Sequence, residues 1–180
     1  MQAPDLIATQ PLPPLIERLG RDHQRISRIN RQLARECDSL ASAEGPDWQK
    51  MADLLHFLRY YADQVHHPLE DRLVDRLLHK GLTPTERHLV FRNLGQHEEI
   101  TAATERIAGQ IELSLGGGVI AIDEFAQMLD DYLALQRKHM RFEETHLFPL
   151  LVAQLDSNDW NILQKIELPD YSEPDSQRTP

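Results

Sequence analysis

The chain has 180 residues, a formal net charge of −10 and a single cysteine. Its length suits one domain with a sizeable core, and its acidic balance, with no basic block, argues against a nucleic-acid or anionic-membrane partner. One cysteine excludes an internal disulfide, and no apolar run is long enough to predict a membrane span. The N-terminus has no secretory-signal pattern. We therefore expect a soluble cytoplasmic protein.

Four long segments with helical periodicity follow one another, separated by residues that break helices. They cover residues 13–40, 48–80, 84–115 and 119–155. Asp47 is a candidate N-cap for the second helix, which is expected to stop at Gly81. The third helix opens with a capping box at residues 83–86, with proline at its first position, and three glycines end it.

A short helix over residues 160–166 is expected after these segments, with residues 157–159 as its cap. Short connections between long helices imply antiparallel neighbours, so the fold class is all-α: an up-down-up-down four-helix bundle with a short C-terminal helix. We place the bundle in residues 12–168, after an N-terminal extension of residues 1–11. Residues 169–180, which contain three prolines and many polar groups, are predicted to form a disordered tail.

The most informative pattern is a histidine followed four residues later by a glutamate, which occurs at His66 and Glu70 and again at His139 and Glu143. This spacing puts both side chains on one face of a helix, about 6 Å apart. An imidazole and a carboxylate so placed can bind one metal ion or flank two. Two such helices that face each other, with single histidines from two more, describe a dinuclear carboxylate site inside a four-helix bundle.

Hairpin geometry predicts one common level for these residues, because positions equidistant from a connecting loop lie at the same depth. The three connections place His23 and His97 level with both histidine–glutamate pairs. At 100° per residue all six residues lie on the apolar stripes of their helices. A single buried histidine or glutamate is common in helical proteins, but burying all six without a cation costs free energy. We therefore predict six metal ligands: His23, His66, Glu70, His97, His139 and Glu143.

The donor atoms narrow the choice of metal. Four imidazoles and two carboxylates, without a thiolate, exceed the four ligands of a structural zinc site. Carboxylates can bridge, so the set fits two ions with open positions better than one. Imidazole with carboxylate favours iron or manganese over calcium or magnesium. Zinc stays an alternative, as does nickel acquired during purification.

The order of these motifs resembles the hemerythrin-like family of His-His-Glu cation-binding domains, over about residues 12 to 155. The residues that carry the likeness are His23, His66-His67-Pro68-Leu69-Glu70-Asp71, His97-Glu98-Glu99, His139-Met140-Arg141-Phe142-Glu143-Glu144 and Leu147-Phe148-Pro149. The resemblance implies a non-haem centre of two iron ions, bridged by carboxylates and often by an oxo group, that meets oxygen, peroxide or nitric oxide. By position, the six predicted ligands match those of the family.

One position departs from the oxygen-carrying hemerythrins, which have two histidines four apart on the third helix. The second matches His97, but the first falls at Asn93, a poorer ligand. The resemblance therefore implies an additional open position and argues against reversible oxygen carriage. His146 lies on the same stripe as His139, near the level of Asn93. We hypothesise that it supplies the missing nitrogen; the alternative is a hydrogen-bonded histidine behind the ligands.

Other residues near the predicted site have two interpretations. His67 is turned about 100° from His66, so we expect it to face a neighbouring helix or the rim rather than a metal. Tyr132 points inward and either packs in the core, which we favour, or hydrogen-bonds a bound oxygen species. Pro68 removes a backbone donor between two predicted ligands, and Pro149 is expected to kink or end the fourth helix.

The resemblance leads to three candidate functions. The first is a di-iron protein that senses or handles oxygen, peroxide or nitric oxide, as in a stress response. The second is an enzyme whose open position turns over peroxide, as a peroxidase or catalase does, or reduces nitric oxide. The third is an iron store or donor. The acidic surface does not indicate which protein partner, if any, receives a signal.

Overall fold

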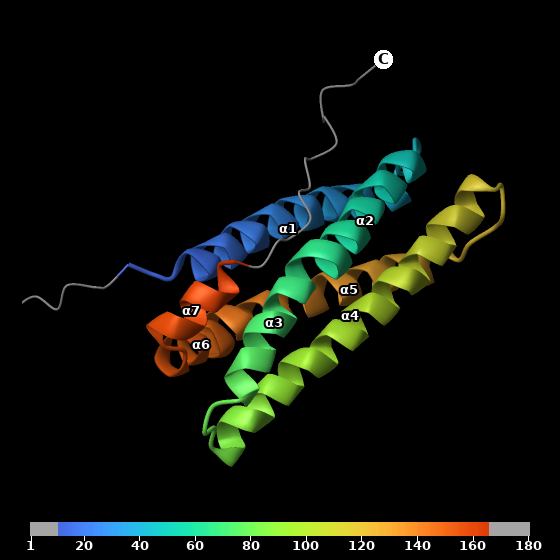
Figure 1. Cartoon of the computed structure of the whole chain (residues 1–180). Helices are drawn as coiled ribbons and strands as arrows, with labels where there is room; N and C mark the ends of the chain where they lie inside the picture. The colour runs from blue at the N-terminus through green and yellow to red at the C-terminus, as the bar shows by residue number, and fades with distance from the viewer. Residues whose placement is uncertain (1–10, 166–180) are drawn as a thin grey trace, which may run out of the picture.

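The computed structural model describes residues 11–165, and within them every regular element is a helix (Figure 1). The elements are α1 (Pro14–Asp38), the 3-10 turn η1 (Ser39–Ala41), α2 (Trp48–Tyr61), the π-helical turn η2 (Ala62–His66), α3 (His67–Leu78), α4 (Pro84–Leu115), α5 (Ile122–Phe142), the π-helical turn η3 (Glu143–Leu147), α6 (Phe148–Gln154) and α7 (Ser157–Leu163). The expected N-terminal extension, apart from Pro11, and the expected disordered tail lie outside the described residues.

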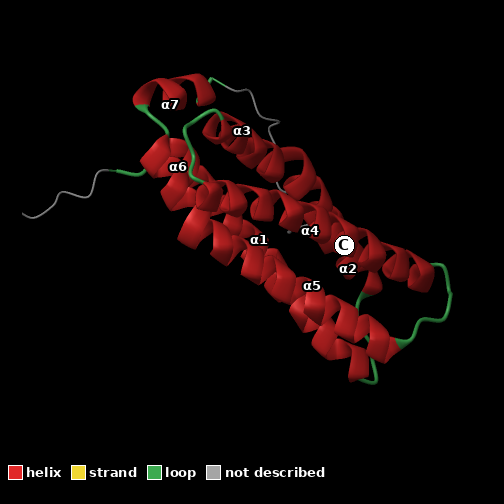
Figure 2. Ribbon diagram, turned by 90° about the horizontal axis from the view of Figure 1, so that it is seen from below, coloured by secondary structure: helices red, strands yellow, loops and turns green. Residues whose placement is uncertain are grey.

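These elements form four long antiparallel arms (Figures 1 and 2). The arms are α1, then α2–η2–α3, then α4, then α5–η3–α6. The first arm contacts the second and the fourth, and α4 contacts the same two, so the arms close into a bundle. Helix α7 packs against α3 at one end. The predicted all-α bundle with a short C-terminal helix is confirmed.

The helix ends follow local capping signals. Asp47 accepts a hydrogen bond from the Lys50 N–H, and Thr83 forms the predicted capping box with Glu86. The prediction for the last helix was wrong in register: Asp156, not residues 157–159, is the N-cap, and the helix ends at Leu163. Asp156 and Asp159 form a capping box of their own, so the helix begins at Ser157, three residues earlier than expected.

Two prolines change the second and fourth arms, at the positions where the sequence predicted that Pro68 and Pro149 would disturb the helix. The N–H of His67, directly before Pro68, donates to the carbonyl of Ala62 five residues back. The N–H of Phe148, directly before Pro149, donates to Glu143 in the same way. Proline lacks an N–H, and its ring clashes with the carbonyl four residues back, so a widened π turn accommodates it. Each π turn holds one extra residue and rotates the faces that follow it. Pro149 therefore does not end the arm, which continues as α6.

A polar layer divides the interior into two apolar clusters. Along α1, Ile16 and Leu19 belong to one cluster, Ile26 and Leu33 to the other, and His23 lies between them. The other three arms show the same division at the levels of their own predicted ligands. Apolar packing on both sides therefore holds the four arms at a fixed spacing around the polar layer.

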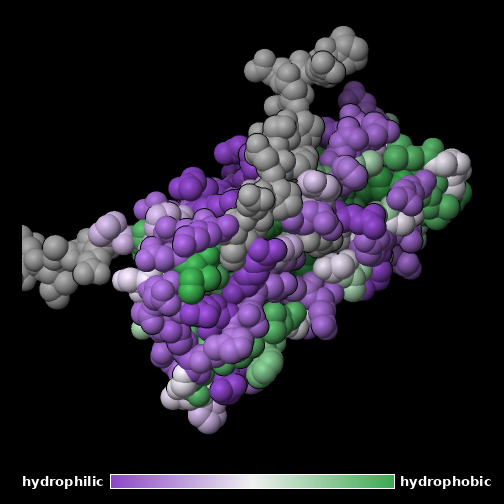
Figure 3. All heavy atoms as spheres, in the orientation of Figure 1, coloured by the Kyte–Doolittle hydropathy of each residue, from purple (hydrophilic) through white to green (hydrophobic). Residues whose placement is uncertain are grey.

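The surface is predominantly hydrophilic on the face shown in Figure 3. Exposed apolar side chains gather where α4 joins α5, and they include Leu113, Leu115, Val119 and Ile122. No helix in residues 11–165 combines the length and apolarity that crossing a membrane requires.

Candidate metal centre

The fold brings all six predicted ligands together in the polar layer. None of them is more than 8% exposed, and Glu70 and Glu143 are fully buried. Each arm contributes: His23 from α1, His66 and Glu70 around the start of α3, His97 from α4, and His139 and Glu143 around the end of α5. The expected common level therefore holds for the side chains as well as for the helix axes.

The six residues form two overlapping groups. In each group, one nitrogen or oxygen atom of every member lies within 4.8 Å of those of the others. The first group is His23, His66, Glu70 and Glu143; the second is Glu70, His97, His139 and Glu143. We call them the His23–His66 side and the His97–His139 side. Both carboxylates belong to both sides, which is the arrangement that two cations bridged by two carboxylates require.

Glu70 tests whether the residues fit a cation. Its carboxylate is fully buried, and neither oxygen forms a hydrogen bond with any described residue. The closest nitrogens are His66 Nε2, 3.7 Å from Oε1, and His97 Nε2, 3.3 Å from Oε2. A buried carboxylate without partners is costly. A metal ion between these atoms would satisfy both oxygens, so the donor set fits a cation.

The outward nitrogen of each histidine faces an acceptor from another arm. The pairs are His23 Nδ1 with Glu144 at 2.9 Å, His66 Nδ1 with Asp22 at 3.6 Å, His97 Nδ1 with Asp71 at 3.6 Å, and His139 Nδ1 with Gln96 at 3.4 Å. An acceptor on Nδ1 keeps the proton there and leaves Nε2 free to bind a metal. Four rings oriented in this way favour a metal site over a set of ordinary core histidines.

These four acceptors, which we call the outer ring, were missed by the sequence reasoning. Each is the sequence neighbour of a ligand on its own arm but supports a histidine on the next arm. Asp22 of the first arm faces the second, Asp71 of the second faces the third, and Gln96 of the third faces the fourth. Glu144 of the fourth arm closes the ring onto His23 of the first. Adjacency to a ligand was the only sequence signal available for them.

Charge and burial perturb the ionisable groups of the layer. Burial alone lowers the pKa of His23, but hydrogen bonding and charge from Glu143, with help from Glu70 and Glu144, raise it to about 9. Burial also lowers the pKa of His97, but its acidic neighbours outweigh this effect and raise the pKa to about 11. Burial raises the pKa of Glu143, yet hydrogen bonds with His139 and the other histidines hold it well below its ordinary value. In the metal-free chain, protonated His23 and His97 therefore balance the charge of the carboxylates, and a metal ion that binds these histidines must displace their protons.

Asn93 lies in the layer at the position where oxygen-carrying hemerythrins have a histidine. Its side chain is fully buried, and its amide nitrogen is 3.3 Å from His97 Nε2. An amide is a weaker donor than an imidazole for iron or zinc. The His97–His139 side therefore has two imidazoles where the resemblance implies three.

The prediction that His146 faces inward and fills this gap was wrong. His146 is exposed, its ring stacks on Phe142 with centroids 5.0 Å apart, and its Nδ1 is 3.2 Å from the Phe142 carbonyl oxygen. The prediction assumed 100° per residue from His139 onward. The π turn η3 lies between the two histidines and adds a residue, so His146 rotates away from the interior.

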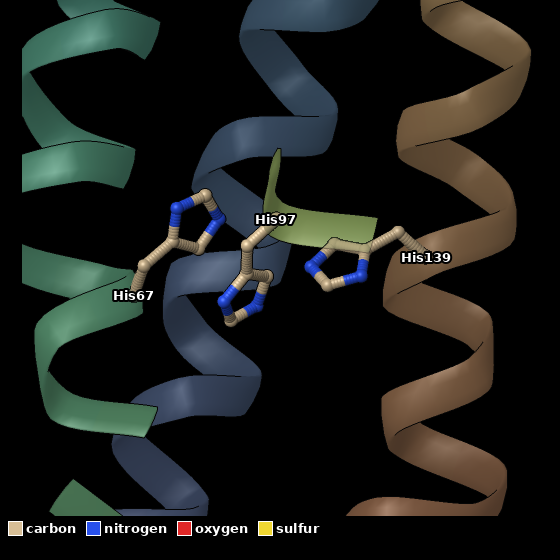
Figure 4. Close-up of side chains that lie close together, drawn as sticks. All are labelled: His67, His97 and His139. Carbon is tan, nitrogen blue, oxygen red and sulfur yellow. The ribbon is translucent and has the colours of Figure 1, made fainter. Parts of the chain in front are cut away.

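His67 comes closer to the layer than we expected. It does face the neighbouring helix, since its ring stacks on His97 with centroids 4.0 Å apart. It is nevertheless only 7% exposed, and its ring nitrogen joins a third group with His97 and His139 (Figure 4). The expectation that it faces a neighbouring helix is therefore confirmed, and its nearness to both His97 and His139 is an addition to that expectation.

A surface cleft reaches this side of the layer. Its lining residues are His67, Pro68, Asp71, His97, Glu98, Thr101 and Ala102. Solvent and small molecules in the cleft therefore come next to His67 and His97.

Tyr132, the remaining candidate, is 1% exposed, packs within one of the apolar clusters and accepts a hydrogen bond from Gln136 at 3.0 Å.

The fold and the layer define a helical bundle whose buried histidine and glutamate clusters can hold metal. A family model described as the hemerythrin HHE cation binding domain matches residues 15–151. The chain therefore belongs to the hemerythrin family, and the resemblance drawn from its motifs is confirmed. Membership implies that the domain binds metal cations, usually iron. Comparison with curated proteins finds no match.

Proposed function

We propose that the chain holds two iron ions in the polar layer and uses them to sense or handle oxygen, peroxide or nitric oxide. The observation that carries this proposal is that the two carboxylates are shared by both groups of buried ligands. In this proposal His23 and His66 would hold one ion, His97 and His139 would hold the other, and Glu70 and Glu143, which belong to both groups, would supply oxygens to both. Manganese and zinc are the alternative occupants that the same donors accept.

Two features support a small reactive ligand. Asn93 occupies the place of the family's third imidazole. The nearest substitute is His67, whose ring nitrogen lies within 4.8 Å of one on His97 and one on His139; in this proposal His67 stays off the metal and the small ligand takes that position. The cleft beside His67 and His97 reaches the same side from solvent. Iron bound there supplies an open Lewis-acidic, redox-active position. The protein orients the ligands, and the cleft offers a route by which small molecules reach them.

The same features support a second candidate, in which the chain turns over peroxide or reduces nitric oxide. An accessible position on a redox-active ion is compatible with turnover as well as with sensing. The two differ in outcome: a sensor forms an adduct or changes oxidation state once, whereas an enzyme consumes its substrate repeatedly. A cytoplasmic location stays a prediction from the sequence.

The test begins with metal content. The chain is produced in iron-supplemented medium, its metals are measured by plasma mass spectrometry, and its ultraviolet–visible spectrum is recorded before and after oxygen, peroxide and nitric oxide. We expect two irons per chain and near-ultraviolet bands that respond to at least one of these molecules. A protein that holds a single zinc, or no metal, would overturn the redox proposal. Repeated consumption of peroxide or nitric oxide by the iron-loaded chain would favour the enzyme.

A further inference from the structure

Tyr61 lies beside the metal centre without being a predicted ligand. It is the last residue of α2 and is 3% exposed. Its ring stacks on Phe57 with centroids 5.3 Å apart, and the Arg25 guanidinium lies over it, 5.0 Å from the ring centroid. Its hydroxyl donates a hydrogen bond of 2.6 Å to Oδ1 of Asp22. The phenol is therefore held in a single orientation, away from solvent.

Asp22 connects this phenol to the centre. Its second oxygen, Oδ2, faces Nδ1 of His66 at 3.6 Å. Both of these atoms are buried, and neither has a hydrogen-bond partner among the described residues. A closure of about half an ångström would bring them to hydrogen-bonding distance and satisfy both. Tyr61, Asp22 and His66 therefore form a continuous polar path from the protein interior to the His23–His66 side.

We propose that Tyr61 is a redox-active tyrosine that supplies an electron to the metal centre through Asp22 and His66 when hydrogen peroxide is the oxidant. This inference rests on the proposed function. Reduction of one peroxide to two waters takes two electrons and two protons. When the centre supplies only one electron, Tyr61 supplies the second and becomes a neutral phenoxyl radical. Its proton passes to the Asp22 carboxylate and stays there, and solvent supplies both protons that the reduction of peroxide consumes.

The surroundings of Tyr61 favour this coupled step. Burial and the hydrogen bond to Asp22 raise the pKa of Tyr61 to about 12, against the opposing effect of Arg25, so the phenol is protonated at neutral pH. Oxidation of a protonated phenol beside a cation is costly unless the proton leaves with the electron. The short contact to Asp22 provides the proton acceptor, and burial protects the radical from solvent.

The test uses the iron-loaded full-length chain, half-oxidised, mixed with one equivalent of hydrogen peroxide and frozen for electron paramagnetic resonance. We expect an organic radical signal that changes shape when the protein contains ring-deuterated tyrosine. Tyr61→Phe keeps the ring packing and removes only the hydroxyl, so the signal is expected to disappear while the iron content is unchanged. Asp22→Asn removes the proton acceptor and is expected to lower the radical yield.

Tyr60→Phe and Tyr132→Phe are the matched controls, because Tyr60 is the exposed sequence neighbour and Tyr132 is a buried tyrosine in the apolar core. Both are expected to retain the signal. A wild-type chain that binds iron and consumes peroxide without a radical would overturn the role of Tyr61, as would a signal unchanged in Tyr61→Phe. A chain without iron would instead overturn the proposed function, and this inference with it.

Discussion

The two sides of the centre share their carboxylates but differ in what surrounds their histidines. On the His23–His66 side, both rings are at most 2% exposed, and Asp22 links His66 to a buried phenol. On the His97–His139 side, a surface cleft reaches His97, which is 8% exposed and stacks on His67. One side is fully buried and connected to the interior, and the other is buried but borders a surface cleft at His97.

Under the proposed function, this difference would let two similar sets of donors play different parts. Two similar donor sets, each with two imidazoles and the same two carboxylates, are made unequal by the residues behind them. In the proposed function, Asn93 and the cleft would favour ligand entry at the His97–His139 side. In the further proposal, the path to Tyr61 would carry the electron and proton transfer at the His23–His66 side. Substitutions at the shared carboxylates should affect both sides alike, whereas substitutions of a histidine or its acceptor should affect one side more than the other.

The largest effect is expected from Glu143→Gln, which removes a charge common to both sides. Glu143 lies 3.0 Å from Nε2 of His23 and 3.0 Å from Nε2 of His139, so an ion bound on either side would be within its reach. We expect the metal content, measured by mass spectrometry after gel filtration, to fall at both positions. Glu99→Gln, an exposed change on α4, is the control and should leave the content unchanged. Full occupancy in Glu143→Gln would contradict the bridging role.

The next effect separates the two sides. His23→Ala removes a nitrogen from one group only, and His139→Ala removes one from the other. Each variant is expected to lose one ion per chain and retain the second. The rate of the spectral change after peroxide is expected to depend more strongly on His139, because the cleft reaches its side. Loss of both ions in either variant would show that the sides do not bind metal separately.

The metal-free chain is expected to lose stability as the pH rises above neutrality. Unfolded histidine titrates near 6.5, whereas the pKa is about 9 for His23 and about 11 for His97 in the fold. Above pH 6.5 the folded chain keeps protons that the unfolded chain has released. Each such proton lowers the free energy of unfolding by about 1.4 kcal/mol per pH unit. For His23 the loss continues to about pH 9, and for His97 to about pH 11.

Urea unfolding at fixed pH values, with a chelator present, measures this dependence. His23→Gln is expected to flatten the slope up to pH 9, and His97→Gln to flatten it over the wider range. The measurement therefore distinguishes the His23–His66 side from the His97–His139 side. A wild-type stability that is constant between pH 7 and 9 would be incompatible with retained protons.

The smallest effects are expected in the outer ring. Removing an acceptor behind a metal-binding histidine typically costs about 10- to 100-fold in metal affinity. Asp22→Asn, at a buried residue, is expected near the upper end, and Asp71→Asn, at an exposed one, near the lower end, because water can replace the lost acceptor there. Competition with a coloured chelator measures both affinities. Equal losses would remove the contrast between the two sides.

Much of this site followed from the sequence alone. A spacing of four residues places His66 with Glu70, and His139 with Glu143, on one helix face whatever the rest of the fold does. Three short connections then determine which levels of neighbouring antiparallel helices coincide. The common layer of six residues was therefore predictable from local geometry and loop positions, without any knowledge of packing.

Two features were decided only by the tertiary structure. They are the directions in which side chains point after the two π turns, and the contacts between residues of different arms. Uniform rotation of 100° per residue placed His146 inside, and the extra residue in the π turn before Phe148 and Pro149 turns it outward. The outer ring and the pairing of Tyr61 with Asp22 join residues on different arms. Such contacts depend on the distance and rotation between packed helices, which the periodicity of one helix does not contain.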